Sequence, residues 1–152
     1  MTPDEIRAAI AASPELQTLA GAGNTQAIAN ALSANRKRVV SRIISARGIA
    51  AEYPGGPTAA EVVLMKLEGA AAAASASADQ SQKVLGSLIS RQLRFLAADG
   101  LDFGSVALRG MLDQFVAMGI LSQAEVDGLK GMAMVDDPIT HTQVGHALRG
   151  DI

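Results

Sequence analysis

The densest group of side chains with a possible chemical role is a run of five basic residues. Arg36, Lys37 and Arg38 are followed by Arg42 and Arg47, and together they are the only concentrated positive charge in the chain. Cations gathered on one face can bind nucleic-acid phosphates without sequence preference. However, no aromatic residue is interleaved for base stacking, and no clear helix-turn-helix lies nearby. We therefore favour a solvated helix end, or a patch that contacts acidic groups of a partner subunit.

A second group could in principle bind a metal ion. Asp136 and Asp137 are followed by His141 and His146, and imidazoles and carboxylates are common ligands. The two histidines are five residues apart, which on a helix turns their rings about 140° away from each other, whereas ligand pairs favour a spacing of three or four. We expect no metal site here.

Other catalytic and cofactor patterns are missing from the sequence. The chain has no cysteine, which excludes thiolate zinc sites, iron–sulfur clusters and cysteine nucleophiles. No serine lies in a Gly-x-Ser-x-Gly elbow, and neither histidine is placed as a general base. The glycines at 21 and 23 and at 55 and 56 lack the rest of a nucleotide-binding motif, so they predict turns. We expect a non-enzymatic protein without cofactors.

Composition sets the class of protein. The 152 residues are 49% apolar but only 3% aromatic, and tryptophan is absent, so small aliphatic residues must fill the core. The net charge of −2 provides no general attraction to nucleic acid or to an anionic membrane. The first five residues are acidic where a signal peptide is basic, and no apolar run approaches the roughly 20 residues of a membrane span. We expect a soluble protein made in the cytosol, with no membrane insertion.

Helix signals recur along the whole chain. Thr2 and Glu5 form a capping box around Pro3, and Ser122 with Glu125 forms another. Apolar residues then follow at spacings of three and four. The pattern predicts an all-α fold, a compact bundle of several short helices. We expect three short helices before residue 35, and further helices over residues 58–75, 81–98, 105–118, 122–132 and 140–149.

The helical pattern is least clear over the segment 36–57. Val39-Val40 and Ile43-Ile44 are β-branched pairs that suit a short strand, whereas residues 45–52 favour helix. The prolines and glycines of Pro54–Pro57 can continue neither element. We therefore expect an N-terminal helical module over 1–53, a break or hinge at 54–57, and a C-terminal helical bundle over 58–152.

Methionines in the last third of the chain are candidates for an adaptable packing surface. Met111, Met118, Met132 and Met134 lie there, together with Phe115. The alternative is that they fill gaps in a core that is short of aromatic residues. Several short helices also carry thin apolar stripes, which another copy of the chain or another protein would bury.

Both ends of the sequence resemble one group of proteins. The segment 2–16 (TPDEIRAAIAASPEL), which continues through 23–29, the segment 100–105 and the ending 137–150 are similar to small, mostly uncharacterised proteins encoded by tailed bacteriophages and prophages. The resemblance covers both ends and part of the middle of the chain and contains no catalytic signature.

The resemblance implies a protein made in the host cytoplasm during infection and present in the virion. We expect a phage structural or assembly protein, a minor component of the tail, baseplate or head-to-tail region, that binds other virion proteins and itself as a homo-oligomer. Alternatives are a soluble phage regulator or inhibitor that binds a host protein, and a nucleic-acid binder that uses the five basic residues.

Overall fold

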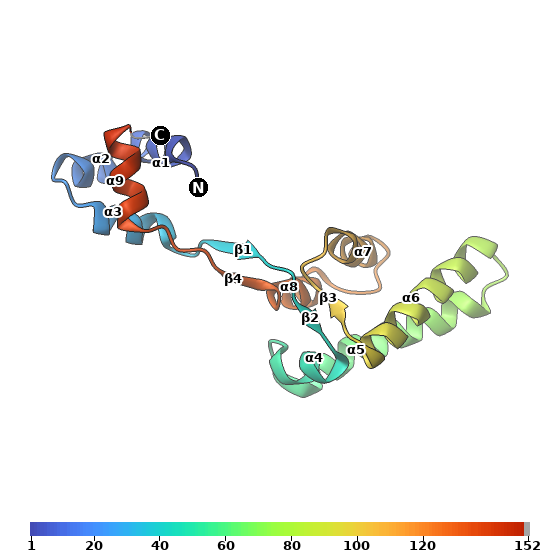
Figure 1. Ribbon diagram of the computed structural model, residues 1–152. Helices are drawn as coiled ribbons and strands as arrows, with labels where there is room; N and C mark the ends of the chain where they lie inside the picture. The colour runs from blue at the N-terminus through green and yellow to red at the C-terminus, as the bar shows by residue number, and fades with distance from the viewer. Residues whose placement is uncertain (151–152) are drawn as a thin grey trace. The chain divides into compact units, whose positions relative to one another are not determined.

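The protein is built almost entirely from α-helices, as the sequence predicts. The computed structural model describes residues 1–150, of which nine helices and four short strands are the regular elements (Figure 1). Helix accounts for 69% and strand for 7% of the structure. The last two residues of the predicted C-terminal bundle, 151 and 152, lie outside the described residues. The all-α fold class is confirmed.

The chain forms two units, and the second is inserted into the first. Unit 1 comprises Met1–Arg38 and Val135–Ile152, and unit 2 comprises Val39–Met134. The chain passes between them twice, through β1 (Lys37–Val39) and β4 (Met134–Asp136), and these two strands are hydrogen-bonded to each other (Figure 1). Unit 1 is therefore assembled from both ends of the sequence.

Unit 1 packs three N-terminal helices against the last helix of the chain. These helices are α1 (Pro3–Ala12), α2 (Pro14–Gly21), α3 (Thr25–Ser33) and α9 (His141–Arg149). Both α1 and α3 contact α9. Local caps fix the helix starts, including the predicted Thr2–Glu5 capping box. The apolar face of each helix supplies one small core, formed by Ile6, Ile10, Leu16, Ile28, Ala29, Ile139, Val144 and Ala147.

Unit 2 contains five helices and a minimal antiparallel strand pair. The helices are α4 (Ala46–Glu52), α5 (Gly56–Ala76), α6 (Gln80–Ala98), α7 (Val106–Ala117) and α8 (Gln123–Gly131). Strand β2 (Ile43–Ile44) pairs with β3 (Leu101–Asp102), with Ile43 opposite Asp102 and Ile44 opposite Leu101. The core includes Ile49, Val63, Leu67, Ile89, Leu96, Phe103, Leu112, Phe115, Val126 and Leu129.

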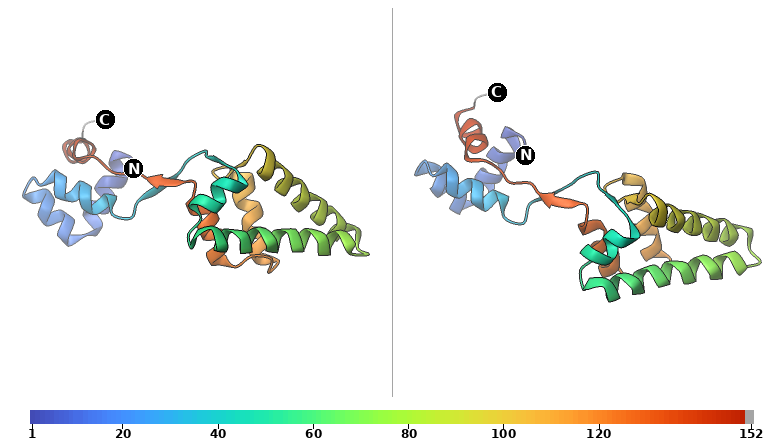
Figure 2. Two further views of the ribbon diagram at one scale, coloured as in Figure 1. Left: turned by 90° about the horizontal axis from the view of Figure 1, so that it is seen from below. Right: turned by 60° about the horizontal axis from the view of Figure 1, so that its bottom comes forward.

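The helices α5 and α6 form an antiparallel hairpin that is the most extensive helix pair of the structure. Figure 2 shows them running in opposite directions on either side of the short connection at residues 77–79. Ala71 and Ala74 of α5 are buried, and Gly86 of α6 lies against the backbone of Ala71 and Ser75. The alanine tract that the sequence shows as helix-forming therefore also permits close approach of the two backbones.

The predicted division of the chain at Pro54–Pro57 differs from the division in the structure. This segment lies inside unit 2, where it joins α4 to α5. The side chains on either side of it, Ile49 and Tyr53 before the break and Val63 after it, belong to the same core. Prolines and glycines end a helix, but they do not separate two cores when the flanking helices pack together.

The ambiguous segment contains both predicted types of structure. Ile43-Ile44 forms β2, and Ala46–Glu52 forms α4 after the cap residue Ser45, whose hydroxyl accepts a hydrogen bond from Gly48 N. The β-branched pairs were thus a correct indication of strand, and the helix began where the serine cap predicts it.

Candidate functional site

Three of the five basic residues are engaged by groups of their own chain. In unit 1, Arg36 donates Nε–H to Oδ2 of Asp137 at 2.7 Å, and Nε of Arg38 lies 3.8 Å from Oδ1 of the same carboxylate. In unit 2, Arg42 lies 2.7 Å from Glu52 and donates to the carbonyl of Met132 at 2.8 Å. These contacts neutralise much of the positive charge that could have attracted phosphate.

The other two basic residues are exposed. Neither Lys37 nor Arg47 forms an ion pair with any residue in the described range 1–150. Lys37 belongs to unit 1 and Arg47 to unit 2. The five residues are therefore distributed over both units. Arg36, Arg38 and Arg42 bind nearby segments of their own unit.

Asp102 is an acidic residue whose role the sequence did not indicate. Its carboxylate accepts hydrogen bonds from the Ser41 hydroxyl at 2.8 Å, from Arg42 N at 2.8 Å and from Gly104 N at 2.9 Å. These bonds, with that from Ser41 the largest contributor, lower the pKa of Asp102 below its ordinary value. The residue holds the chain before β2 against the turn after β3, which is a structural task.

A second polar cluster ties α5 to α8. Lys66 donates to Glu125 at 2.6 Å, and this bond is the main cause of a lowered pKa of Glu125, with the Ser122 capping contacts adding to it. Burial of the Tyr53 phenol, together with the nearby charge of Glu125, raises the pKa of Tyr53. A protonated phenol that donates to the Glu125 carbonyl at 3.3 Å stabilises packing between α4 and α8.

The candidate metal ligands do not form a cluster. Among residues 1–150, no group of three or more His, Cys, Asp or Glu side chains is arranged to hold a metal ion. Asp137 instead pairs with Arg36, and His141 begins α9 directly after the Thr140 cap.

The residues of the predicted methionine surface differ in how far they are buried. Phe115 and Met132 are buried in the unit 2 core, while Met111 and Met134 are half-buried. Only Met118 is exposed, at 45%. Phe115 and Met132 therefore fill the core, and Met118 is the one residue of the predicted interface that is exposed for contact with a partner.

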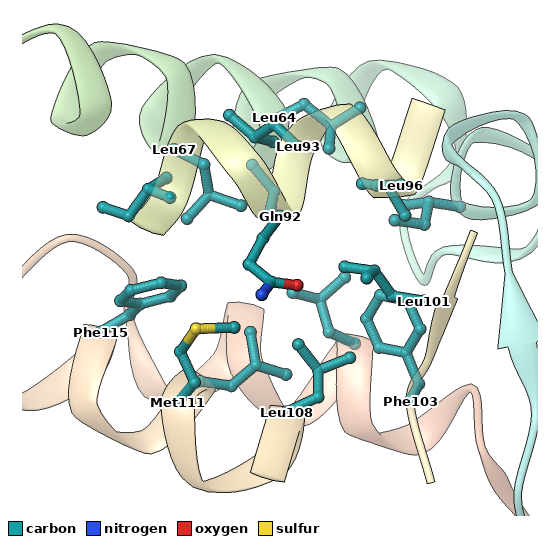
Figure 3. Close-up of a pocket in the computed structure, with 15 residues that line it drawn as sticks. Leu64, Leu67, Gln92, Leu93, Leu96, Leu101, Phe103, Leu108, Met111 and Phe115 are labelled. Atoms are coloured by element: carbon teal, nitrogen blue, oxygen red, sulfur yellow. The ribbon is translucent and has the colours of Figure 1, made fainter. Parts of the chain in front are cut away.

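A small apolar pocket lies in unit 2, between α5, α6 and α7. It has a volume of about 30 Å³ and is lined by leucines, isoleucines, phenylalanines and Met111 (Figure 3). The side chain of Gln92 is the single amide among these residues, and Figure 3 shows its end directed between Met111 and Leu101. Such a volume holds about one or two waters, far less than a cleft for a small-molecule ligand. The pocket is a packing void near a polar side chain.

The outer side of α6 is the strongest candidate for a functional surface. Val84, Leu88 and Phe95 are 60%, 40% and 47% exposed. Because successive helical residues turn by about 100°, these three side chains lie within about 40° of one another, and about 120° from the buried Ile89 and Leu96. We call Val84, Leu88 and Phe95 the α6 stripe. It is an apolar surface that unit 2 itself leaves uncovered.

Positive charge accompanies the α6 stripe. Lys83, Arg91 and Arg94 are exposed along one edge of the stripe, and the helix from Gln80 to Ala98 contains no acidic residue. Shallow grooves of about 350 and 430 Å³ follow the stripe, the first beside Val84 and Leu88 and the second beside Phe95. The surface is thus suited to an apolar partner that carries negative charge.

The outer side of α5 is also apolar, and one edge of it is acidic. Val62 and Met65 are 45% and 60% exposed, and Gly69 and Ala73 continue the same side of the helix. We call Val62, Met65, Gly69 and Ala73 the α5 stripe. Glu61 and Glu68 lie along one edge of it and are exposed.

Sequence reasoning found the apolar periodicity of α6 but missed its outer stripe. Val84, Leu85, Leu88, Ile89, Leu93 and Leu96 all satisfy a spacing of three or four, so apolar residues cover more than one side of the helix. Two features of the sequence could have revealed a second surface: the number of apolar residues, which is larger than one buried side needs, and the absence of acidic residues from the helix.

Comparison with known proteins adds no further constraint. No protein-family model matches the sequence, and neither a curated protein nor a solved structure matches it. Within residues 1–150, no helix is both long enough and apolar enough to cross a membrane.

Proposed function

We propose that this chain is a non-enzymatic bacteriophage structural or assembly protein, a minor virion component that acts through helix-mediated contacts of the α5–α6 hairpin. The observation that carries the proposal is the α6 stripe. Three large apolar side chains are aligned and exposed on one side of a well-packed helix. Aligned exposed apolar residues with a charged border are typical of surfaces that bind another protein.

The virion setting is supported by the resemblance of both chain ends to proteins of tailed phages. These ends, including segments 2–16 and 147–150, belong to unit 1. The candidate docking surface belongs to unit 2. The two supports are therefore independent of each other.

The nucleic-acid alternative has less support than the docking surface. Arg36, Arg38 and Arg42 already contact Asp137 or Glu52. A phosphate ligand would have to compete with these carboxylates.

Mass spectrometry of purified particles tests the proposal. We expect the chain to be present at a reproducible copy number relative to the major capsid protein. Its absence from the particles would refute the proposal and would favour a soluble regulator that captures a host protein in pull-downs from infected cells.

A pair of variants tests the surface itself. Leu88→Ser with Phe95→Ser should remove most of the chain from particles, whereas Val106→Ser should not. Val106 is a matched control because it is 88% exposed but lies outside the α5–α6 hairpin. Equal incorporation of the two variants would show that the α6 stripe is not the contact.

A further inference from the structure

We propose that the α6 stripe of one copy docks on the α5 stripe of a second copy, so that the chains associate head to tail. The inference rests on the proposed function only for its biological setting. Its physical basis is that one chain carries both halves of a complementary contact. The α6 half is apolar with a positive border, and the α5 half is apolar with a negative border.

Within residues 1–150, the charged residues of both halves make no ion pair. None of Glu61, Glu68, Lys83, Arg91 and Arg94 forms an ion pair with another residue of the described range. By contrast, Lys66 on the opposite edge of the α5 stripe is paired with Glu125, which neutralises its charge within unit 2. The hairpin therefore leaves opposite charges unpaired on its two outer surfaces.

A single chain cannot pair its own two stripes. Helix α5 turns Val63 and Leu67 inward, and α6 turns Ile89 and Leu96 inward. The α5 stripe lies on the side of its helix opposite these buried residues, and the α6 stripe lies about 120° from its own. Both stripes thus point away from the shared core, and only another molecule can bring them together.

The spacing of the charges fits a single docked arrangement. Glu61 and Glu68 are separated by about 10.5 Å along the axis of α5, at a rise of 1.5 Å per residue. Lys83 and Arg91 are separated by about 12 Å along α6. Long basic side chains span the difference easily, so both opposite-charge pairs can form at once.

The surfaces also allow close approach. Gly69 has open space where a side chain would be, and Ala73 is exposed beside it. Small residues flanked by Val62 and Met65 leave a shallow path for the larger Leu88 and Phe95 of the other copy. Because the two halves differ, the contact is heterologous, and repetition of it produces a ring if the rotation closes and a filament if it does not.

Charge exchange provides the experiment. We would measure sedimentation of the full chain over a concentration series, for the wild type, for Glu61→Lys/Glu68→Lys, and for Lys83→Glu/Arg91→Glu. Each double variant carries like charges on both stripes and should associate about 100-fold more weakly, since like charges facing each other strongly disfavour an interface. An equimolar mixture of the two variants should associate again, because each then meets an opposite charge.

Matched controls separate this effect from net charge. Glu15→Lys/Asp136→Lys and Lys37→Glu/Arg47→Glu change the net charge by the same amounts at exposed positions outside the hairpin. They should associate as the wild type does. Circular dichroism checks that every variant retains its helix content, and the recovery in the mixture excludes simple misfolding.

Three results would overturn the inference: a wild type that is monomeric at every concentration, double variants that associate unchanged, or a mixture that does not recover. Cosedimentation with anionic vesicles that is lost in Lys83→Glu/Arg91→Glu, without self-association, would overturn it too and would assign the α6 stripe to a lipid surface. Particle mass spectrometry decides the proposed function separately, so a chain found in virions without charge-dependent association refutes this inference alone.

Discussion

Replacing Gly86 with alanine tests how closely α5 and α6 approach. A Cβ atom at this position would lie 2.4 Å from Oγ of Ser75, 2.7 Å from Ser75 N and 2.8 Å from the carbonyl oxygen of Ala71. The serine hydroxyl can rotate away, but the other two atoms are backbone atoms of α5. To restore a contact of ordinary length, the two helices would have to separate.

The change in stability of Gly86→Ala depends on two opposing contributions, helix propensity and steric overpacking. In a helix interior, alanine is more favourable than glycine by about 1 kcal/mol. Overpacking of a closely packed site costs about 1–3 kcal/mol. We expect the steric cost at Gly86 to lie near the upper end of this range, since backbone atoms supply two of the three contacts. The net loss of unfolding free energy should then be about 1–2 kcal/mol.

Urea denaturation followed by circular dichroism measures the difference. Gly69→Ala in α5 and Gly110→Ala in α7 are matched controls, since a Cβ at either site meets nothing within 4 Å. Both should stabilise the protein, by about 0.5–1 kcal/mol each. Adding Ser75→Ala to Gly86→Ala should recover only part of the loss. If Gly86→Ala raised stability as the controls do, the close packing of α5 on α6 would be refuted.

Three further predictions concern Gly104, Asp102 and the Lys66–Glu125 pair. Gly104→Ala should be more damaging than Gly86→Ala, since its Cβ would lie 1.9 Å from the carbonyl oxygen of Val40, and thermal melting should show a lower midpoint or no cooperative transition. The lowered pKa of Asp102 means that its carboxylate stabilises the fold above the unfolded-state pKa of about 3.9, and that this contribution is lost as the pH falls through the lower folded-state pKa. Asp102→Asn should therefore lower the unfolding free energy at pH 7. The variant should also lose less stability than the wild type when the pH is lowered, and urea denaturation at pH 7 and at acidic pH measures both effects. Lys66→Met should raise the pKa of Glu125 toward its ordinary value in a carboxyl NMR titration, and an unchanged pKa would contradict the assigned cause.

Local structure could be predicted from the sequence because its causes are local. A capping box places the Thr2 hydroxyl and the Glu5 carboxylate within four residues, so the start of α1 is visible in the letters alone. The same holds for α8, whose start follows Ser122 and Glu125. The predicted helices accordingly agree with the structure to within about one or two residues.

The division into units could not be predicted in this way. It depends on contacts of α1 and α3 with α9, more than 100 residues later in the chain. No local signal announces that Val144 will pack in a core with Ile6. The Pro54–Pro57 break, by contrast, gives a strong local signal at a place where one core continues.

The surroundings of the candidate sites depend on contacts that only folding brings about. The basic run was visible, but its neutralising carboxylates at Glu52 and Asp137 are brought to it only by folding. For α6, a spacing of three and four shows that apolar faces exist, and only the packed structure shows which face stays uncovered.

The alignment of exposed apolar residues, rather than exposure alone, is what distinguishes the two stripes from the rest of the surface. Val106 and Ile43 are more exposed than Phe95, at 88% and 70%. Single apolar residues of this kind are ordinary on a protein surface and require no partner. The α6 stripe is different because three such side chains share a narrow arc of one helix and carry a border of unpaired positive charge. Since α5 presents an acidic border on the same hairpin, the docking that we propose joins two unlike surfaces and would give the assembly one direction.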